Sequence, residues 1–495
     1  MEPYILAIDQ GTTGSRALIV DHDGNVRGRG YAEIRQHYPR PGWVEHDPLE
    51  IWKKTLQAME EAKHAAGAAD RDIAAIGITN QRETTMLIDR RSGEPVGQAI
   101  VWQCRRTAAR CDELRARGLA QSIRAKTGLV PDAYFSATKL EWLLDRSPRL
   151  RRMAERGQVL FATVDTWLIW KLTGGAVHAT DFSNASRTML FNINSLKWDD
   201  DLLELFGVPA AALPETQPSS GLFGYTTRGI PISGVAGDQQ AALFGQGCYE
   251  PGMAKATYGT GAFVLMNTGE EAIASEHGLL TTLACTASSK AEYALEGSIF
   301  VAGAAIQWLR DELKLINDAA ESERLAMQIE DSGGVYFVPA FVGLGAPHWD
   351  MRARGMLIGL TRGSGRAQIT RAALESMAYQ VGDIVDAMIE DSGLPLLELR
   401  TDGGAAVNDF LMQFQADITG VRVSRPAMLE STALGAAYLA GLATGFWHSR
   451  QEIESLRGAS RSTFAPRLDT TERQALRLGW ARAVERARGW LVEQQ

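Results

Sequence analysis

The sequence predicts an α/β protein made of two domains that share one plan. Its 495 residues are enough for two large domains, each with a full hydrophobic core. A strand–turn–strand unit over residues 5–20 recurs over residues 253–267, and both turns are rich in glycine and threonine. Residues 231–247 (PISGVAGDQQAALFGQG) have the pattern of a short apolar strand, a glycine corner and a helix. Such corners are typical of open α/β sheets, which bind ligands at the carboxyl ends of their strands.

Composition narrows the possible partners and compartment. The formal net charge of −8 argues against a nucleic acid or an anionic membrane surface as the main partner. Cys104, Cys111, Cys248 and Cys285 have no metal-like spacing, so we expect reduced thiols in the cytosol. The first predicted strand begins at about Tyr4, so we expect no signal peptide. No apolar run reaches the roughly 18 residues that a membrane helix needs, so we expect no membrane insertion.

The first domain is predicted to open with an antiparallel meander of strands at residues 4–8, 16–21 and from about 25. The first strand ends on Asp9, and the turn Gln10–Ser15 (QGTTGS) follows. Its backbone N–H groups and hydroxyls suit a phosphate, although most Gly/Thr turns are only turns. Asp9 would repel that phosphate unless Mg²⁺ lay between them, which makes it a candidate metal ligand.

A pair of adjacent charges follows the next strand, predicted at residues 73–79. Arg82 offers a fork of donors and Glu83 an acceptor, as the neighbouring hydroxyls of a polyol would require. The alternative is an ion pair in an exposed turn, which is common. Further along, Trp102 ends another predicted strand, and Tyr134 lies in a predicted loop, where it either packs against a small ligand or covers the core.

Asp238, directly after the glycine corner, is the candidate general base of a phosphoryl transfer. A carboxylate there would lie at a strand end and near the N–H groups that begin the next helix. The competing interpretation is that Asp238 only caps its helix, and for this residue alone the cap is favoured. Residues 181–187 (DFSNASR) are predicted to be a polar loop that supports the cleft.

The domain boundary is placed at a change of composition near residues 245–252, which gives domains 1–246 and 247–495. A further repeat is predicted in the second domain, where residues 399–414 form a strand, a glycine pair and a helix. We align this segment with the corner at Asp238; its glycines would let a nucleotide approach the helix N-terminus. From residue 452 to its end the chain is predicted to be a charged, helical cap.

The chain resembles the FGGY carbohydrate kinases nearly end to end, in the motifs DQGTTGSR from Asp9, NQRET from Asn80, IVWQCRR from Ile100, GDQQAALFGQ from Gly237, YGTG from Tyr258 and DGG from Asp402. The resemblance implies two actin-like (ribonuclease H-like) ATPase domains with a catalytic cleft between them. The first domain would bind glycerol and carry the base, and the second would bind the nucleotide. The reaction implied is ATP-dependent phosphorylation of glycerol to sn-glycerol 3-phosphate, the first step of glycerol breakdown.

The resemblance also implies roles for single residues. Asp238 matches the catalytic base, and Asp9 matches the carboxylate that organises Mg²⁺ through water. Glycerol would be held by Arg82, Glu83, Trp102, Tyr134, Asp238, Gln239 and Phe263. ATP or ADP would be held by Thr12, Thr13, Gly14, Arg16, Thr260, Gly303, Gln307, Gly404 and Asn408. Family members are often dimers or tetramers, so a homo-oligomer is expected.

Two features depart from the family pattern, and two other functions remain open. Gly14 stands where the family usually has serine, and we expect a small effect. Residues 221–230 are short, with Arg228 as the one basic residue, which predicts insensitivity to fructose 1,6-bisphosphate. The alternative substrate is another small polyol or sugar, such as erythritol or xylulose. An actin-like nucleotide switch is the third possibility, but it would have no use for Arg82, Glu83 and Trp102 at converging strand ends.

Overall fold

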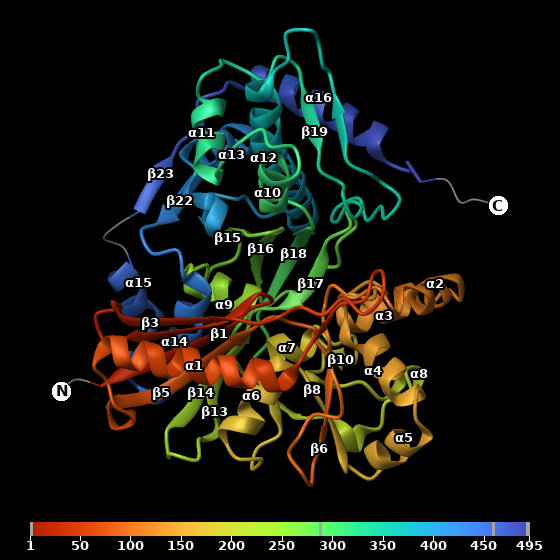
Figure 1. Ribbon diagram of the computed structural model, residues 1–495, viewed down its shortest axis with the longest axis vertical. Coiled ribbons are helices and arrows are strands. Elements are labelled where there is room, and N and C mark those ends of the chain that lie inside the picture. Colours follow the sequence, from red (N-terminus) through yellow and green to blue (C-terminus); the bar gives the residue numbers. More distant parts are fainter. Residues whose placement is uncertain (1–2, 287–289, 458–460, 492–495) are drawn as a thin grey trace.

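The computed structural model describes residues 3–286, 290–457 and 461–491, and they form two lobes (Figure 1). The first lobe contains the N-terminal half of the chain and lies at the bottom of the view. The second contains most of the C-terminal half, in green to blue. Each lobe is built around one large sheet, and helices pack against both sheets. The predicted α/β class is therefore confirmed.

The sheet of the first lobe has six strands. In spatial order they are β13 (Ser220–Tyr225), β14 (Pro231–Gly237), β5 (Ile73–Asn80), β1 (Tyr4–Gln10), β2 (Gly14–Val20) and β3 (Val26–Glu33). The first three strands of the chain form the predicted antiparallel meander. β1, β5 and β14 run parallel, so their carboxyl ends meet at one edge of the sheet.

The sheet of the second lobe has seven strands. In spatial order they are β17 (Leu280–Leu283), β18 (Tyr293–Ile299), β16 (Ala262–Gly269), β15 (Ala254–Tyr258), β21 (Glu398–Asp402), β22 (Arg422–Pro426) and β23 (Arg461–Phe464). β15, β16 and β18 repeat the antiparallel meander, and β15, β21 and β22 repeat the parallel set. The two lobes therefore share a core of five strands, as the repeated strand–turn–strand unit predicts.

One predicted repeat is aligned wrongly. β21 lies beside β15 as β5 lies beside β1, so β21 corresponds to β5 and not to β14. The counterpart of β14 is β22. A strand, glycines and a helix follow one another at several corners of such a sheet, and the pattern alone does not say which strand is the neighbour.

The first lobe carries a large insertion between β5 and β13, over residues 81–219. Its strands are β6 (Met86–Asp89), β7 (Ala99–Ile100), β8 (Val159–Ala162), β9 (Ala179–Asp181), β10 (Phe191–Asn192), β11 (Lys197–Trp198) and β12 (Glu215–Gln217). Its helices are α2 (Ala108–Ala116), α3 (Ala120–Thr127), α4 (Ser136–Asp145), α5 (Pro148–Glu155), α6 (Val164–Leu172), α7 (Phe182–Ser186) and α8 (Asp200–Leu205). The prediction of a loop at 181–187 is wrong, because Asp181 caps α7 by accepting hydrogen bonds from the N–H groups of Ser183 and Asn184.

Long helices cover the sheets. In the first lobe α1 (Pro48–Ala66) begins at the cap Asp47 and ends at Gly67, which is left-handed, as its sequence predicts. In the second lobe α10 (Gly303–Asp311), α11 (Ala319–Ala326), α12 (Arg366–Ser392) and α13 (Asp409–Thr419) pack on one another. The C-terminal end contains α15 (Arg450–Arg457) and α16 (Thr470–Ala487), but also β23, so it is not purely a helical cap.

The helix α14 (Ser431–Thr444) crosses from the second half of the chain onto the first lobe. It packs against α9 (Asp238–Gly245) and against β1, β5 and β14. Glycines make this close approach possible: a Cβ at Gly77 would lie 2.2 Å from the carbonyl oxygen of Ala436, and one at Gly435 1.9 Å from that of Ala241. The predicted boundary after residue 246 divides the chain in sequence. In space, however, α14 from beyond that boundary packs on the first lobe.

The described helices give no sign of a membrane-spanning segment, since none combines sufficient length with an apolar sequence. Cys104, Cys111, Cys248 and Cys285 are buried, and none of them forms a disulfide.

Candidate active site

The carboxyl ends of β1, β5 and β14 bring the predicted polar residues of the first lobe together. Asp9 lies at the end of β1, Arg82 and Glu83 follow β5, and Asp238 follows β14. Nε of Arg82 lies 3.3 Å from Oδ1 of Asp238, which joins two of these strand ends directly. The expected convergence of Arg82, Glu83 and Asp238 is present in the fold.

Asp238 is the first residue of α9 and keeps 28% of its side chain exposed. Gly237 occupies the cap position, so Asp238 is not the N-cap residue of its helix. Its Oδ1 accepts a hydrogen bond from the N–H of Gln239 at 2.7 Å. Burial raises the pKa of Asp238, while Arg82 and Lys255 oppose that rise. A reachable carboxylate with a raised pKa is suited to accepting a proton.

Asp9 is the second carboxylate at this edge. Burial raises its pKa to about 6; the charge of Arg16 works against that shift, and the charge of Asp238 adds to it. Arg16 is the residue opposite Asp9 in the pairing of β1 with β2. Asp9 thus lies close enough to Asp238 for the negative charge of Asp238 to act on its pKa.

The described residues contain no group of three or more His, Cys, Asp or Glu side chains that could by itself hold a metal ion. Mg²⁺ in phosphoryl-transfer sites is held by one or two carboxylates together with substrate phosphates and water. Asp9, at the end of β1, is a carboxylate of the kind that such a partial site uses.

Arg82 is buried and connects the two lobes. It donates from Nη1 to Oε2 of Glu296 at 2.7 Å and from Nη2 to Oε1 at 2.9 Å, so the pair is bidentate. Glu296 belongs to β18 of the second lobe. Nη2 of Arg82 also donates to the hydroxyl of Tyr134 at 3.1 Å, and Nη1 to Gln240 at 3.1 Å. Arg82 is thus fixed from several sides, with its Nε toward Asp238.

A second arginine, Arg187, completes this network. It follows α7 and donates from Nε to Oε1 of Glu83 at 2.7 Å and from Nη2 to Oε1 of Glu296 at 3.0 Å. Burial by itself would raise the pKa of Glu296, but Arg187 and Arg82 lower it to about 2. No sequence pattern singled out Glu296, and Arg187 was expected only as part of the polar segment 181–187 that supports the cleft. A glutamate inside an apolar strand (YALEGSI) was the available signal for Glu296.

Glu83 has an unusual backbone conformation. Its φ of 60° is rare for a residue with a side chain, and such strain often marks functional positions. The carbonyl oxygen of Glu83 accepts hydrogen bonds from Ser136 at 3.1 Å and from the buried Lys139 at 3.4 Å. These contacts hold the turn after β5 in place, so the carboxylate of Glu83 is presented by a fixed backbone.

Aromatic rings from both lobes form one wall beside the charged network. Trp102 packs edge-to-face against Tyr134, with ring centroids 5.5 Å apart, and against Phe263, 6.4 Å apart. Phe263 comes from β16 of the second lobe. Nε1 of Trp102 donates to Oγ1 of Thr12 at 2.9 Å, which links the wall to the first glycine-rich turn. The structure places Tyr134 in this wall and in contact with Arg82, so its predicted loop is part of the site.

Lys255, on β15, is a further buried charge that the sequence analysis did not identify. Its Nζ donates to Oγ1 of Thr257 at 2.9 Å and to Oε1 of Gln239. Burial lowers the pKa of Lys255 to about 8, and the carboxylates of Asp402 and Asp238 oppose that shift. Gln239, a predicted substrate ligand, is thus oriented by a residue of the other lobe.

A cavity of about 460 Å³ lies in the second lobe, between the turn after β15 and helices α10 and α11. Five of the predicted nucleotide ligands line it: Thr260, Gly303, Gln307, Gly404 and Asn408. Leu374 and Met377 of α12 and Ile306 of α10 supply apolar surface, which suits a base. α11 also contributes to the lining, and the sequence analysis did not identify that segment.

Glycines shape one side of this cavity. A Cβ at Gly303 would lie 2.5 Å from the carbonyl oxygen of Gly259, and the N–H of Gly303 donates to that oxygen at 3.0 Å. The turn after β15 is thus bonded to the start of α10. At Gly404 a Cβ would meet no atom within 4 Å, so this position opens onto free space. Asn408 caps α13 by accepting a hydrogen bond from Leu411 N–H at 2.8 Å.

The other predicted nucleotide ligands, in the first turn, lie outside this cavity. Thr12 accepts a hydrogen bond from Nε1 of Trp102, and Thr13 is exposed. The guanidinium carbon of Arg16 lies over the ring of Tyr31, 5.8 Å from its centroid. A Cβ at Gly14 would lie 2.7 Å from the ring of Tyr31, so that ring fills the space of the family's usual serine. These four residues therefore belong to the first lobe, beside Asp9 and Trp102.

Comparisons with known proteins agree with this architecture. Residues 4–245 match the N-terminal domain and residues 254–444 the C-terminal domain of the FGGY family of carbohydrate kinases. A protein named glycerol kinase from Symbiobacterium thermophilum is 61% identical, over 99% of both chains. Glycerol kinase from Caldanaerobacter subterraneus is 59% identical over the full length of both. The solved structure of Plasmodium falciparum glycerol kinase with ADP is 38% identical, covers 100% of this chain and 99% of its own, and has a TM-score of 0.92. The chain belongs to the FGGY family of carbohydrate kinases.

Proposed function

We propose that this protein transfers the γ-phosphate of ATP to a terminal hydroxyl of glycerol and produces sn-glycerol 3-phosphate. The observation that carries the proposal is the joint presence of Asp238, Arg82, Glu83 and an aromatic wall at converging strand ends. Relatives of about 60% identity over the whole chain carry the name glycerol kinase, which favours this substrate. The cavity in the second lobe would take the nucleotide.

Glycerol is small and polar, so its recognition requires several hydrogen bonds and an apolar wall for its C–H edge. Arg82, Glu83 and Asp238 would bind the hydroxyls, and Gln239 would add a side-chain amide. Trp102 and Phe263 would contact the carbon chain, with Tyr134 behind them. A site built around hydroxyl groups rejects analogues that lack them by roughly 10⁴-fold or more.

Asp238 would accept the proton of the attacking hydroxyl. Its raised pKa, its exposure of 28% and its place at the start of α9 fit this role. Arg82, fixed by Glu296, keeps the carboxylate oriented through Nε. Because the base is held by a network that includes both lobes, its position depends on how the lobes sit on each other.

The nucleotide would lie with its base in the cavity of the second lobe, between Gly404, Asn408, Gln307 and Gly303. Its phosphates would reach the turns that contain Thr260 and Thr12–Gly14, and Arg16 would add positive charge. Mg²⁺, held by the phosphates and through water by Asp9, would neutralise charge on the phosphoryl group. Phosphoryl transfer needs mainly such positioning and charge stabilisation.

The test is ADP release from ATP in the presence and absence of glycerol. We expect glycerol to stimulate it far above the background rate, and the product to be phosphorylated at a terminal carbon. A panel with erythritol, xylulose and gluconate tests the substrate, and a clear preference for one of them would contradict the proposal. We further propose a cytoplasmic homo-oligomer, a dimer or tetramer, which sedimentation at several concentrations would test.

A further inference from the structure

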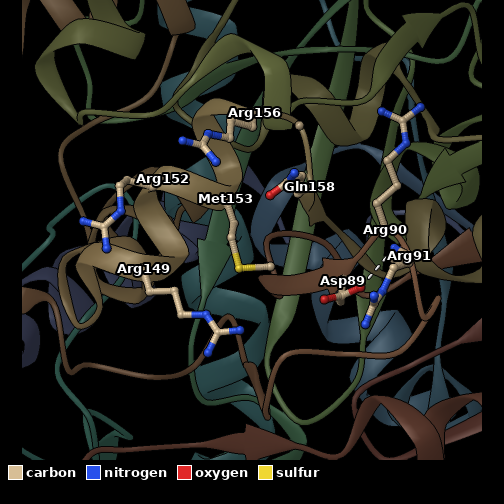
Figure 2. Close-up of a pocket in the computed structure, with 9 residues that line it drawn as sticks. Asp89, Arg90, Arg91, Arg149, Arg152, Met153, Arg156 and Gln158 are labelled. Carbon is tan, nitrogen blue, oxygen red and sulfur yellow. Dashed lines mark hydrogen bonds between the residues drawn. The ribbon is translucent and has the colours of Figure 1, made fainter.

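A second large cavity, of about 720 Å³, lies on the first lobe, away from the strand ends that carry Asp238. It opens between α5 and the turn after β6, which lie at the bottom of Figure 1. Figure 2 shows that arginines dominate its lining: Arg90, Arg91, Arg149, Arg152 and Arg156. Nothing in the proposed reaction uses these residues.

The local structure holds the arginines on two opposing sides of the cavity. Arg149, Arg152 and Arg156 are spaced by three and four residues along α5 and its end, which places them on one face. Arg90 and Arg91 come from the turn after β6 (Figure 2). The backbone N–H of Arg90 donates to the carbonyl oxygen of Gln158 at 2.9 Å, so the turn is fastened to the segment after the helix.

Within the described part of the chain, the guanidinium groups of Arg90, Arg149, Arg152 and Arg156 form no ion pair or hydrogen bond with another residue. Arg151, on the same helix, shows the usual alternative, because it pairs with Asp145 and donates to the carbonyl oxygen of Gly207 at 2.6 Å. Four of the five arginines of the cavity therefore have no partner among the described residues.

One carboxylate, Asp89, lines the cavity beside Arg91 (Figure 2). Its Oδ1 accepts hydrogen bonds from the backbone N–H groups of Arg91 at 3.0 Å and Ser92 at 2.9 Å. This acid thus closes the turn, and one negative charge remains against five positive ones. Such a concentration is notable in a chain whose formal net charge is −8.

Chemistry identifies the ligand class. The planar guanidinium fork matches the oxygens of a phosphate and binds them in pairs, more strongly than a neutral hydrogen bond would. Arginines on two facing walls suit a ligand with more than one phosphate. A membrane surface would need exposed apolar side chains next to the basic ones, and Met153 is the one large apolar residue of the lining. We propose that this cavity binds a small soluble anion that carries several phosphate groups.

The test is calorimetric titration of the full-length protein with inorganic tripolyphosphate, at low salt, without Mg²⁺ and with saturating ADP to fill the nucleotide cavity. We expect one binding site whose affinity falls steeply as KCl is added. The variant Arg152→Ala/Arg156→Ala should bind about 10- to 100-fold more weakly, since it loses charge-assisted hydrogen bonds. Arg152→Lys/Arg156→Lys keeps the positive charge but loses the planar guanidinium fork. Its affinity should lie between those of the unmodified protein and the double-alanine variant.

The control is Arg71→Ala/Arg117→Ala, which removes two exposed charges of the same lobe outside the cavity. It should bind like the unmodified protein, and thermal unfolding should show that all variants fold. Equal affinity in the Arg152/Arg156 variants and the unmodified protein would overturn the proposal, as would loss of binding when ADP is added. Inorganic phosphate binding as tightly as tripolyphosphate would contradict a ligand with several phosphates. Sedimentation with phosphatidylcholine–phosphatidylglycerol vesicles, without tripolyphosphate binding, would indicate a membrane headgroup instead.

Discussion

The two lobes use the same five-strand core in opposite ways at their strand ends. In the first lobe the parallel strands β1, β5 and β14 present charged side chains at their ends, and Arg82 after β5 contacts both Asp238 after β14 and Glu296. In the second lobe Gly403 and Gly404 follow β21, the counterpart of β5, and a cavity of about 460 Å³ opens there. We call the strand ends of the first lobe the filled edge, because functional side chains occupy them. We call the strand ends of the second lobe the cleared edge, because they leave space for a ligand.

This difference shows how one scaffold can be divided between chemistry and nucleotide binding. A small substrate must be surrounded by side chains, because it offers few atoms for recognition. A nucleotide is large and needs free space next to the backbone, which glycine provides. Substitutions in either lobe, and a change of pH, therefore test this division between chemistry and nucleotide binding.

The largest effect is expected from Asp238→Asn. The substitution keeps the shape of the filled edge but removes the proton acceptor, so kcat should fall by about 10²–10⁴-fold. The dissociation constant of glycerol, measured by calorimetry, should change little. Near-normal turnover in this variant would remove Asp238 from the role of base.

Arg82→Ala is expected to act mainly on glycerol binding. It removes charge-assisted hydrogen bonds, so the KM for glycerol should rise by about 10- to 100-fold. It also leaves Glu296 buried with one partner fewer, and the free energy of unfolding should fall by about 3–5 kcal/mol. Glu296→Gln is the matched test of positioning. Glu296 holds Arg82 and has no proposed contact with glycerol, yet this substitution should also raise the KM for glycerol. An unchanged KM in Arg82→Ala would contradict its placement.

The pH dependence of kcat/KM is expected to have an acid limb set by the filled edge. Burial raises the pKa of Asp9 to about 6, so this carboxyl is protonated and neutral below that pH. A neutral Asp9 would no longer favour the cation at the phosphates, so kcat/KM should decline as the pH falls, by about tenfold per unit below pH 6. The measurement is a profile from pH 8 to pH 5 at constant ionic strength, and a flat profile would contradict it.

In the cleared lobe, Gln307→Ala should raise the KM for ATP by about 5- to 10-fold, the loss of one ordinary hydrogen bond. The KM for glycerol should stay unchanged, because Gln307 lines the cavity of the second lobe alone. If both KM values rose together, the proposed division between the lobes would be wrong.

The smallest effect is expected from Gly14→Ser, which restores the residue usual in the family. The added side chain would meet the ring of Tyr31, which is 46% exposed and free to turn toward solvent. The KM for ATP should therefore change by less than about twofold, because the backbone N–H is already in place. A tenfold change would show that the turn after β1 tolerates no side chain.

Local patterns in the sequence predicted the parts of the site that one segment supplies. Asp238 follows a strand and a glycine, so it could be identified as a candidate from its neighbours, whereas Gln307 was assigned only through the family resemblance. The paired meanders and the helix that begins at Asp47 were also predictable, because period, caps and turn residues are local signals.

The parts that depend on contacts between distant segments could not be predicted in this way. Glu296 and Arg187 lie more than a hundred residues apart, and only the folded chain brings them to Arg82. Lys255 looks like an ordinary strand residue until Gln239 is placed opposite it. The wrong alignment of β21 has the same cause, since a strand's own residues do not specify which strand lies next to it in the sheet.

The position of α14 has a consequence for how the molecule is made. The face of the first sheet that contains Ile5 and Ala7 is covered by Ala433, Ala437 and Tyr438, which the ribosome delivers more than four hundred residues later. Until then a nascent N-terminal half has an uncovered apolar surface. The first lobe can therefore complete its folding only after nearly the whole polypeptide has been synthesised. A fragment that ends at the gap between the two family domains would expose this apolar surface to solvent.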